Sequence, residues 1–166
     1  MPFYLIRLNK KRRWDRDAYS WLGPNQAPAD VYQEFRVDDG KLSVWHIEDD
    51  RSNLDRVITA LAVTRQTFDV FDFGLFDQML VPGSGVRVEV SDGKTPLHSA
   101  NHWHRNLIQL TTDNFGVLAK ALFDMMERDR RYASDIRTMI IDAVRAQEVE
   151  LSEVDEKMRA RIQQAS

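Results

Sequence analysis

Cysteine is missing from this sequence of 166 residues. Its absence excludes disulfide bonds, thiolate catalysis and metal binding by thiolates, and it fits a reducing compartment. The sequence also lacks a run of about 18 consecutive apolar residues, and its apolar N-terminal segment is too short for a secretion signal. We therefore expect a soluble, cytoplasmic protein that does not insert into a membrane.

Complete catalytic and cofactor motifs are absent as well. Residues 82–85 read PGSG, but they lack the lysine and the hydroxyl residue of a phosphate-binding loop, and a predicted strand follows them. Neither the G-x-S-x-G nor the H-E-x-x-H pattern occurs. We therefore expect no bound cofactor, and any active site would have to be assembled from residues far apart in the sequence.

The composition is that of an ordinary globular protein, with 43% hydrophobic and 30% charged residues. A chain of this length can bury a substantial core without cross-links, so one domain is the default. The formal net charge is −3, yet residues 1–16 contain six basic residues and one acidic residue. The charge of the whole chain therefore favours no acidic partner, and the basic N-terminal region needs a separate explanation.

Residues 41–76 carry the strongest fold signal, because they read in order as strand, helix and strand. Four apolar residues of the helix recur at the i, i+3, i+4 and i+7 spacing of a single helical face. They are Leu54, Val57, Ile58 and Leu61. Ser52 stands three residues before Asp55, which predicts a capping box at the helix start. A helix over about 53–65 fits a right-handed parallel crossover, although an antiparallel return satisfies the same pattern.

Other elements flank this block, and together they indicate the fold class. The predicted strands are Phe3–Leu8, 31–37, 86–91 and 107–111, with a tight hairpin turn at 38–40. The predicted helices are 112–126 and 133–146. The order favours an α+β or α/β two-layer domain over residues 1–146, with a mixed sheet of about four to six strands, one crossover helix and a helical C-terminal part. Residues 147–166 should form a charged C-terminal helix, which can lie at the periphery.

Three histidines within seven positions, His98, His102 and His104, are the nearest approach to a metal site in the sequence. If the second half of this segment is extended, His102 and His104 lie on one face and can both reach a divalent ion. His98, or a carboxylate such as Asp72 or Asp92, could complete the set. Without a zincin or deaminase signature, the same histidines also fit polar loop residues or hydrogen-bonding groups at a strand edge.

His46 differs from the loop histidines because it lies inside an apolar predicted strand. A buried imidazole needs partners for both ring nitrogens, and a carboxylate on a neighbouring strand would fix its tautomer. Asp69 and Asp72 are the candidates for that carboxylate. His46 and Asp72 are therefore the candidate catalytic residues, and a purely structural pair at a strand end is the alternative.

Lys10, Lys11, Arg12 and Arg13 form the basic cluster of the chain, next to Trp14. Clustered cations can neutralise phosphates while aromatic rings stack on bases, so the cluster is a candidate for phosphate or nucleic-acid contact. The same charge can dock an acidic protein surface, and a basic run after a strand is also typical of a solvated turn.

The first functional hypothesis is a small interaction or regulatory protein without catalytic activity, which binds another protein through its surface. It rests on the missing motifs, on the basic cluster and on an apolar stripe in the C-terminal helix. The stripe consists of Leu151, Val154, Met158 and Ile162. It can pack on the chain's own domain or contact a partner helix, and the oligomeric state is not fixed by the sequence.

The alternative hypothesis is a hydrolase or transferase for phosphate-containing or nucleotide substrates. In this hypothesis Arg7 and the basic cluster hold phosphate, while His46 or His102 acts as acid and base. It predicts that these residues converge on one cleft, whereas the first hypothesis predicts that they scatter. A third hypothesis is a nucleic-acid-binding module whose affinity falls steeply with salt. We favour the interaction protein.

Overall fold

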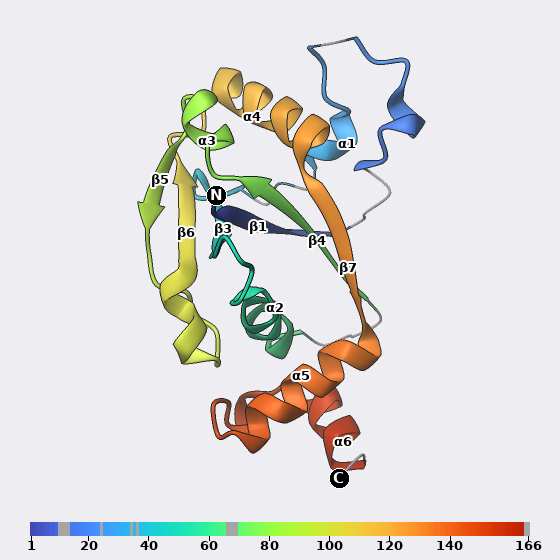
Figure 1. Cartoon of the computed structure of the whole chain (residues 1–166), viewed down its shortest axis with the longest axis vertical. Coiled ribbons are helices and arrows are strands. Elements are labelled where there is room, and N and C mark those ends of the chain that lie inside the picture. Colours follow the sequence, from blue (N-terminus) through green and yellow to red (C-terminus); the bar gives the residue numbers. More distant parts are fainter. Residues whose placement is uncertain (10–13, 24, 34, 36, 66–69, 165–166) are drawn as a thin grey trace.

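An antiparallel sheet with helices on both faces forms the centre of the computed structural model (Figure 1), which describes all residues except 10–13, 24, 34, 36, 66–69 and 165–166. The strands are β1 (Phe3–Leu8), β2 (Val37–Asp38), β3 (Lys41–Ile47), β4 (Val70–Asp77), β5 (Arg87–Val90), β6 (His104–Ile108) and β7 (Glu127–Tyr132). The α-helices are α1 (Ala29–Tyr32), α2 (Leu54–Val63), α3 (Leu80–Gly83), α4 (Thr112–Met125), α5 (Ala133–Arg145) and α6 (Glu156–Gln164). Short 3-10 helices are η2 (Asp17–Tyr19), η3 (His98–Trp103) and η4 (Leu151–Glu153). Within the described part of the chain, no helix is long and apolar enough to cross a membrane.

Six strands of the sheet follow the order β5-β6-β3-β1-β4-β7, and β2 pairs with β3 outside this path. Every pairing among the described strands is antiparallel. The predicted α+β class is therefore confirmed, whereas the expected mixed sheet is wrong. Strand direction could not be predicted because the apolar pattern of a strand buried on both faces is the same for either direction.

Helix α2 forms the predicted crossover between β3 and β4. Both strands pair antiparallel with β1, so they run parallel to each other with β1 between them. The arrangement is a split β-α-β unit, in which a parallel crossover and an antiparallel sheet coexist. This arrangement is possible because β1 is apolar on both faces and can occupy the central position of the sheet.

The start of α2 differs from the predicted capping box. The N-cap residue is Asn53, whose Oδ1 accepts a hydrogen bond from the Glu48 N–H at 2.9 Å. The Asn53 Nδ2 donates to the carbonyl of His46 at 3.1 Å. Ser52 instead donates its backbone N–H to Asp50, at 3.0 Å. Asn53 therefore ties the end of β3 to the start of α2 and does not cap the helix's first amides.

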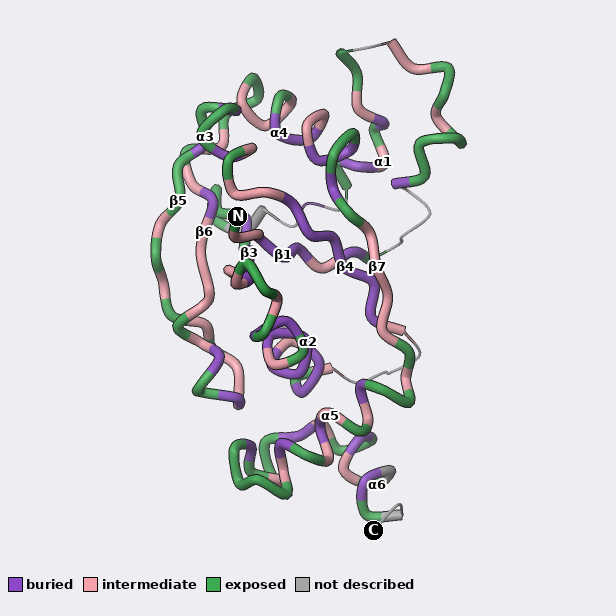
Figure 2. Tube along the Cα trace, in the orientation of Figure 1, coloured by how far each residue is buried: buried purple, intermediate pink, exposed green. Residues whose placement is uncertain are grey.

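Alternate residues of the central strands point into two separate cores. In β1, Leu5 faces one core, whereas Tyr4 and Ile6 face the other. The first core lies beneath α2, α5 and α6, and the second lies beneath α1 and α4; Figure 2 shows the buried stretches along the strands between them. The domain therefore has three layers and not the expected two, because both faces of β1, β3 and β4 are apolar.

Two further segments differ from the prediction. Residues 31–37 are expected as a strand, but Val31 and Tyr32 are the last residues of α1, and among the described residues of this range only Val37 belongs to a strand. The apolar residues Val31 and Phe35 are both buried, and their spacing of four suits a helical turn as well as a strand. Strand β7 was not predicted, because it lacks alternating apolar residues: its sequence is Glu127, Arg128, Asp129, Arg130, Arg131 and Tyr132.

The hairpin between β2 and β3 is confirmed. Asp38 pairs with Lys41, and the two residues between them adopt positive φ angles of 49° at Asp39 and 70° at Gly40. Two successive positive φ values are typical of a type I′ turn, which matches the twist of antiparallel strands. Glycine at the second position removes the steric penalty of that conformation.

The C-terminal segment packs into the first core. Val154 and Met158 are each 1% exposed, and Val149 and Ile162 are buried in the same cluster as α2 and α5. The helix expected over 147–166 begins only at α6, and η4 precedes it. Val149, Val154, Met158 and Ile162 therefore belong to the same core as α2 and α5.

Candidate functional site

The three clustered histidines occupy different environments. His98 and His102 are exposed on η3, and the His102 ring lies 4.3 Å from that of Trp103. His104 belongs to β6 and is hydrogen-bonded to serine side chains. Among the residues that the structure describes, no group of three or more His, Cys, Asp or Glu side chains is arranged to hold a metal ion.

His46 and Asp72 do not meet. The Nδ1 of His46 lies 2.6 Å from Nε2 of Gln78, and its Nε2 lies 3.6 Å from a carboxylate oxygen of Glu48. Asp72 is 7% exposed and forms two hydrogen bonds with Arg130, at 2.6 and 3.0 Å. Asp72 thus connects β4 to β7, and His46 has other partners.

The remaining predicted residues are those of the basic cluster, Asp69 and the apolar stripe. Lys10, Lys11, Arg12, Arg13 and Asp69 fall outside the described residues. The stripe of Leu151, Val154, Met158 and Ile162 packs against the first core. This packing leaves Val154, Met158 and Ile162 with little surface for a partner helix.

A polar cluster around His104 joins β3, β6 and β5. The His104 Nε2 lies 2.8 Å from the hydroxyl of Ser43, and its Nδ1 lies 2.8 Å from the hydroxyl of Ser91. Asn106 donates from Nδ2 to the same Ser91 hydroxyl at 2.9 Å. The imidazole ring packs edge-on against Trp45, with ring centres 5.2 Å apart. Because a neutral imidazole has one donor and one acceptor nitrogen, it satisfies both hydroxyls without a charge.

A cavity of about 440 Å³ opens beside this cluster, between the end of α2 and the chain after β5. Gly93 lies on its wall, and a β-carbon there would come within 2.7 Å of the Trp45 ring. Only glycine therefore allows this segment to approach Trp45 so closely. The cavity is lined by both hydroxyls that contact His104, Ser43 and Ser91.

The cluster resembles a nucleophile with its base only in part. A serine hydroxyl at 2.8 Å from an imidazole nitrogen has the geometry of general-base activation. The second nitrogen of His104, however, meets the neutral hydroxyl of Ser91, whereas an acyl-transfer triad places a carboxylate there to stabilise the imidazolium. The arrangement is better suited to a structural role, in which hydrogen bonds hold three strands together, than to proton transfer.

Burial lowers the pKa of His104 below its ordinary value of 6.5, and the charge of Arg105 acts in the same direction, whereas Ser91 and Asp92 oppose it. The folded protein therefore binds this proton less readily than the unfolded chain does. Between about pH 7.5 and 5.5, we expect wild type to lose more unfolding free energy than the His104→Gln variant. Urea unfolding at several pH values measures this difference, and equal losses in the two proteins would contradict it.

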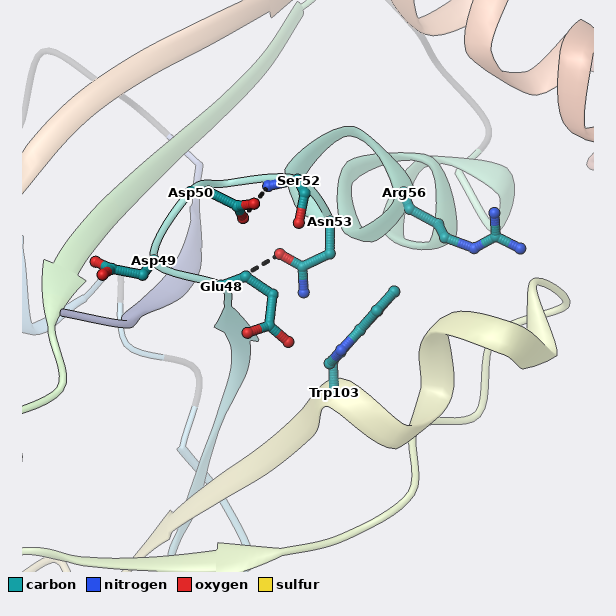
Figure 3. Close-up of a pocket in the computed structure, with 7 residues that line it drawn as sticks. All are labelled: Glu48, Asp49, Asp50, Ser52, Asn53, Arg56 and Trp103. Atoms are coloured by element: carbon teal, nitrogen blue, oxygen red, sulfur yellow. Dashed lines mark hydrogen bonds between the residues drawn. The ribbon is translucent and has the colours of Figure 1, made fainter.

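A second hollow, of about 810 Å³, lies where β3 meets α2 (Figure 3). Its acidic residues do not converge, because Asp49 points away from the others and Asp50 accepts the Ser52 N–H. Asn53 occupies the middle and accepts the Glu48 N–H. These side chains hold the β3–α2 connection in place, so the hollow has no free set of ligand groups.

Strand β5 is an edge strand with exposed side chains. Among the described strands it pairs only with β6, and it forms the outer edge in Figure 1. Val88 is 38% exposed and Val90 is 74% exposed, on the same face of the strand. Valines that alternate with Arg87 and Glu89 are typical of a strand with one exposed face, and the structure places this strand at an edge of the sheet.

The backbone N–H and C=O groups of alternate residues in β5 point toward the open edge. Ser91 donates its N–H to the His104 carbonyl at 3.5 Å, in the register of the β5–β6 ladder. Hydrogen-bonded pairs alternate with non-hydrogen-bonded pairs along an antiparallel ladder. Arg87 and Glu89 therefore bond toward β6 as Ser91 does, and the N–H and C=O groups of Val88 and Val90 point outward. They are available to a further strand.

The opposite edge, β7, is protected by charge. Arg130 is paired with Asp72, and Glu127 is paired with Arg51 at 2.6 Å. Arg131 contacts Asp55 at 3.2 Å. A row of charged side chains is a common device against edge-to-edge pairing. The two edges of the sheet thus differ: β5 exposes Val88 and Val90 along its middle, whereas on β7 the exposed Tyr132 stands at the end of a run of charged residues.

Comparison with known proteins gave no match, whether to a family model, a curated protein or a solved structure.

Proposed function

We propose that this chain is a non-enzymatic interaction protein that binds another polypeptide by strand addition at β5. The observation that carries the proposal is the open edge of β5, where the backbone groups of Val88 and Val90 point outward beside their exposed side chains. In strand addition, main-chain hydrogen bonds supply affinity and alternate side chains supply specificity.

The distribution of the other candidate residues supports a surface-acting protein. His46, Asp72 and His104 each have separate partners, and none of them contacts another of the three. An enzyme of the kind considered above requires a nucleophile, a base and phosphate-binding groups that converge within hydrogen-bonding reach. Among the described residues, His46, Asp72 and His104 do not converge on one another, which supports a protein that acts through its surface.

Site-specific photo-crosslinking in the native cell tests strand addition directly. A photoreactive amino acid placed at Val90 should form a discrete adduct with a second polypeptide. The matched control position is Val117, which is 55% exposed on α4 and lies away from the edge. We expect an adduct from Val90 and none from Val117, because a partner strand would lie alongside β5 only.

The Val88→Pro variant distinguishes strand addition from nonspecific binding to the exposed apolar side chains of β5. Proline removes an N–H that points outward, so the ladder between β5 and β6 keeps its own hydrogen bonds. We expect the Val90 adduct to disappear in this variant. An adduct that forms equally from Val117, or that survives Val88→Pro, would contradict the proposal.

A further inference from the structure

We infer that the strand bound at β5 is β5 of a second copy of this chain, an inference that rests on the proposed strand addition. Residues 86–90 read V-R-V-E-V and are symmetric in residue class about Val88. When a segment pairs antiparallel with a second copy of itself, its residues lie opposite the same residues in reverse order. The sequence around Val88 is therefore complementary to itself, which is the requirement for a two-fold symmetric interface.

The register of this pair follows from the direction of the backbone groups. With the two-fold axis at Val88, the outward N–H and C=O groups of Val88 face those of Val88 of the partner subunit. The two residues exchange both hydrogen bonds, as a hydrogen-bonded pair does. Val90 then lies opposite Val86 of the partner subunit. This register uses the backbone groups that β6 leaves free.

Charge complementarity favours the same register. Arg87 lies opposite Glu89 of the partner subunit, and Glu89 lies opposite Arg87 of the partner subunit. These are non-hydrogen-bonded pairs, in which the side chains approach most closely. Lys41 contacts Glu89 at 3.0 Å from the inner side, so Glu89 would receive one cation from each side. The paired strands therefore juxtapose opposite charges on one face of the sheet.

Apolar contacts lie on the other face. Val88 lies opposite Val88 of the partner subunit at the axis, and Val90, which is 74% exposed, lies opposite Val86 of the partner subunit. Val86 is already buried in the second core, so the apolar area that the pairing covers belongs mainly to Val88 and Val90. One strand pair buries less area than a stable dimer usually does, so we expect a reversible dimer with a micromolar dissociation constant.

Charge reversal gives a sharp test by analytical ultracentrifugation. The protein should sediment as a concentration-dependent dimer between about 1 and 500 μM. Arg87→Glu places two pairs of like charges across the axis, and so does Glu89→Arg. We expect each single variant to weaken dimerisation at least tenfold, by about 1.4 kcal/mol. Lys157→Glu, which changes the charge equally at an exposed position on α6, should dimerise like wild type.

A mixture of the two single variants tests the proposed register directly. The two acidic positions of the Arg87→Glu chain then face the two basic positions of the Glu89→Arg chain, so every pair is again complementary. We expect a heterodimer whose affinity is within about threefold of the wild-type value. Restored association also shows that both variants are folded. A mixture that stays monomeric while wild type dimerises would overturn the register.

The failure of this inference can be distinguished from that of the proposed function. If wild type stays monomeric at every concentration while Val90 forms a Val88-dependent adduct with a different protein, self-pairing is wrong and strand addition stands. If wild type stays monomeric and no Val88-dependent adduct forms, both are wrong. A Val90 adduct with the chain itself, lost in Arg87→Glu, supports both.

Discussion

Phe73→Ala should lower the free energy of unfolding by about 3–5 kcal/mol, the usual cost of removing a buried phenylalanine. Phe73 lies in the middle of β4 and has no exposed surface. Its ring packs in the first core, 6.2 Å from the ring of Phe71 and beneath the crossover helix. Loss of the ring removes apolar contacts and leaves a cavity, because the rigid sheet and helix can close around it only in part.

Urea unfolding measures this loss, and Val90→Ala provides the control. Val90 is also apolar and also lies in a strand, but it is mostly exposed, so its replacement should change stability by less than about 0.5 kcal/mol. A cost of Phe73→Ala below about 1 kcal/mol would contradict the three-layer packing, because it would mean that the face beneath α2 is not covered.

Met158→Ala should lower the free energy of unfolding by about 2–5 kcal/mol, since a buried methionine side chain is lost. Met158 lies on α6 and belongs to the same core as α2 and α5, although about a hundred residues separate α6 from α2. The C-terminal segment would then unfold together with the rest of the domain in a single transition. Circular dichroism during urea unfolding measures both the midpoint and the cooperativity.

The neighbouring Lys157 supplies the control for this prediction. Its side chain is exposed on the same helix, so Lys157→Ala should change stability by less than about 0.5 kcal/mol. If Met158→Ala also left the main transition unchanged, residues 147–166 would be a peripheral helix. The apolar stripe would then be free for a partner.

Local patterns of the sequence predicted the elements whose residues interact with near neighbours. The apolar spacing over 53–65 located α2, and the turn at 38–40 located the β2–β3 hairpin, because both depend on a few adjacent residues. Strand order was not predictable, since β1 enters between β3 and β4 from far away in the sequence. Strand β7 was missed because its edge position tolerates charged residues that a buried strand would exclude.

The candidate site was predicted only in part, for a related reason. The alternation of valines with charges located β5 and its exposure, which are local properties. The hydrogen bonds of His104 join Ser43 and Ser91, which are distant in sequence and carry no motif. Likewise, Asp72 finds Arg130 and not His46, because pairing follows the register of β4 with β7.

The architecture explains why β5 is the strand left open. Helices cover both faces of the central strands, and β7 is edged with paired charges. In Figure 2, most of β5 is exposed, and the strand follows α3 directly. The hydrogen bonds of His104 with Ser43 and Ser91 connect β6 to β3 and to the residue that follows β5, so they hold this end of the edge in place. A rigid strand loses little conformational entropy when a partner strand binds.

Residue-resolved amide hydrogen exchange tests the open edge of β5 most directly. At a dilution where the protein is monomeric, the amides of Val88 and Val90 should exchange at least about tenfold faster than those of Glu89 and Ser91, which bond to β6. At high protein concentration, the Val88 and Val90 amides should become protected while the other two change little. Equal protection of all four amides in the dilute protein would show that the edge is not open, and the account would be wrong.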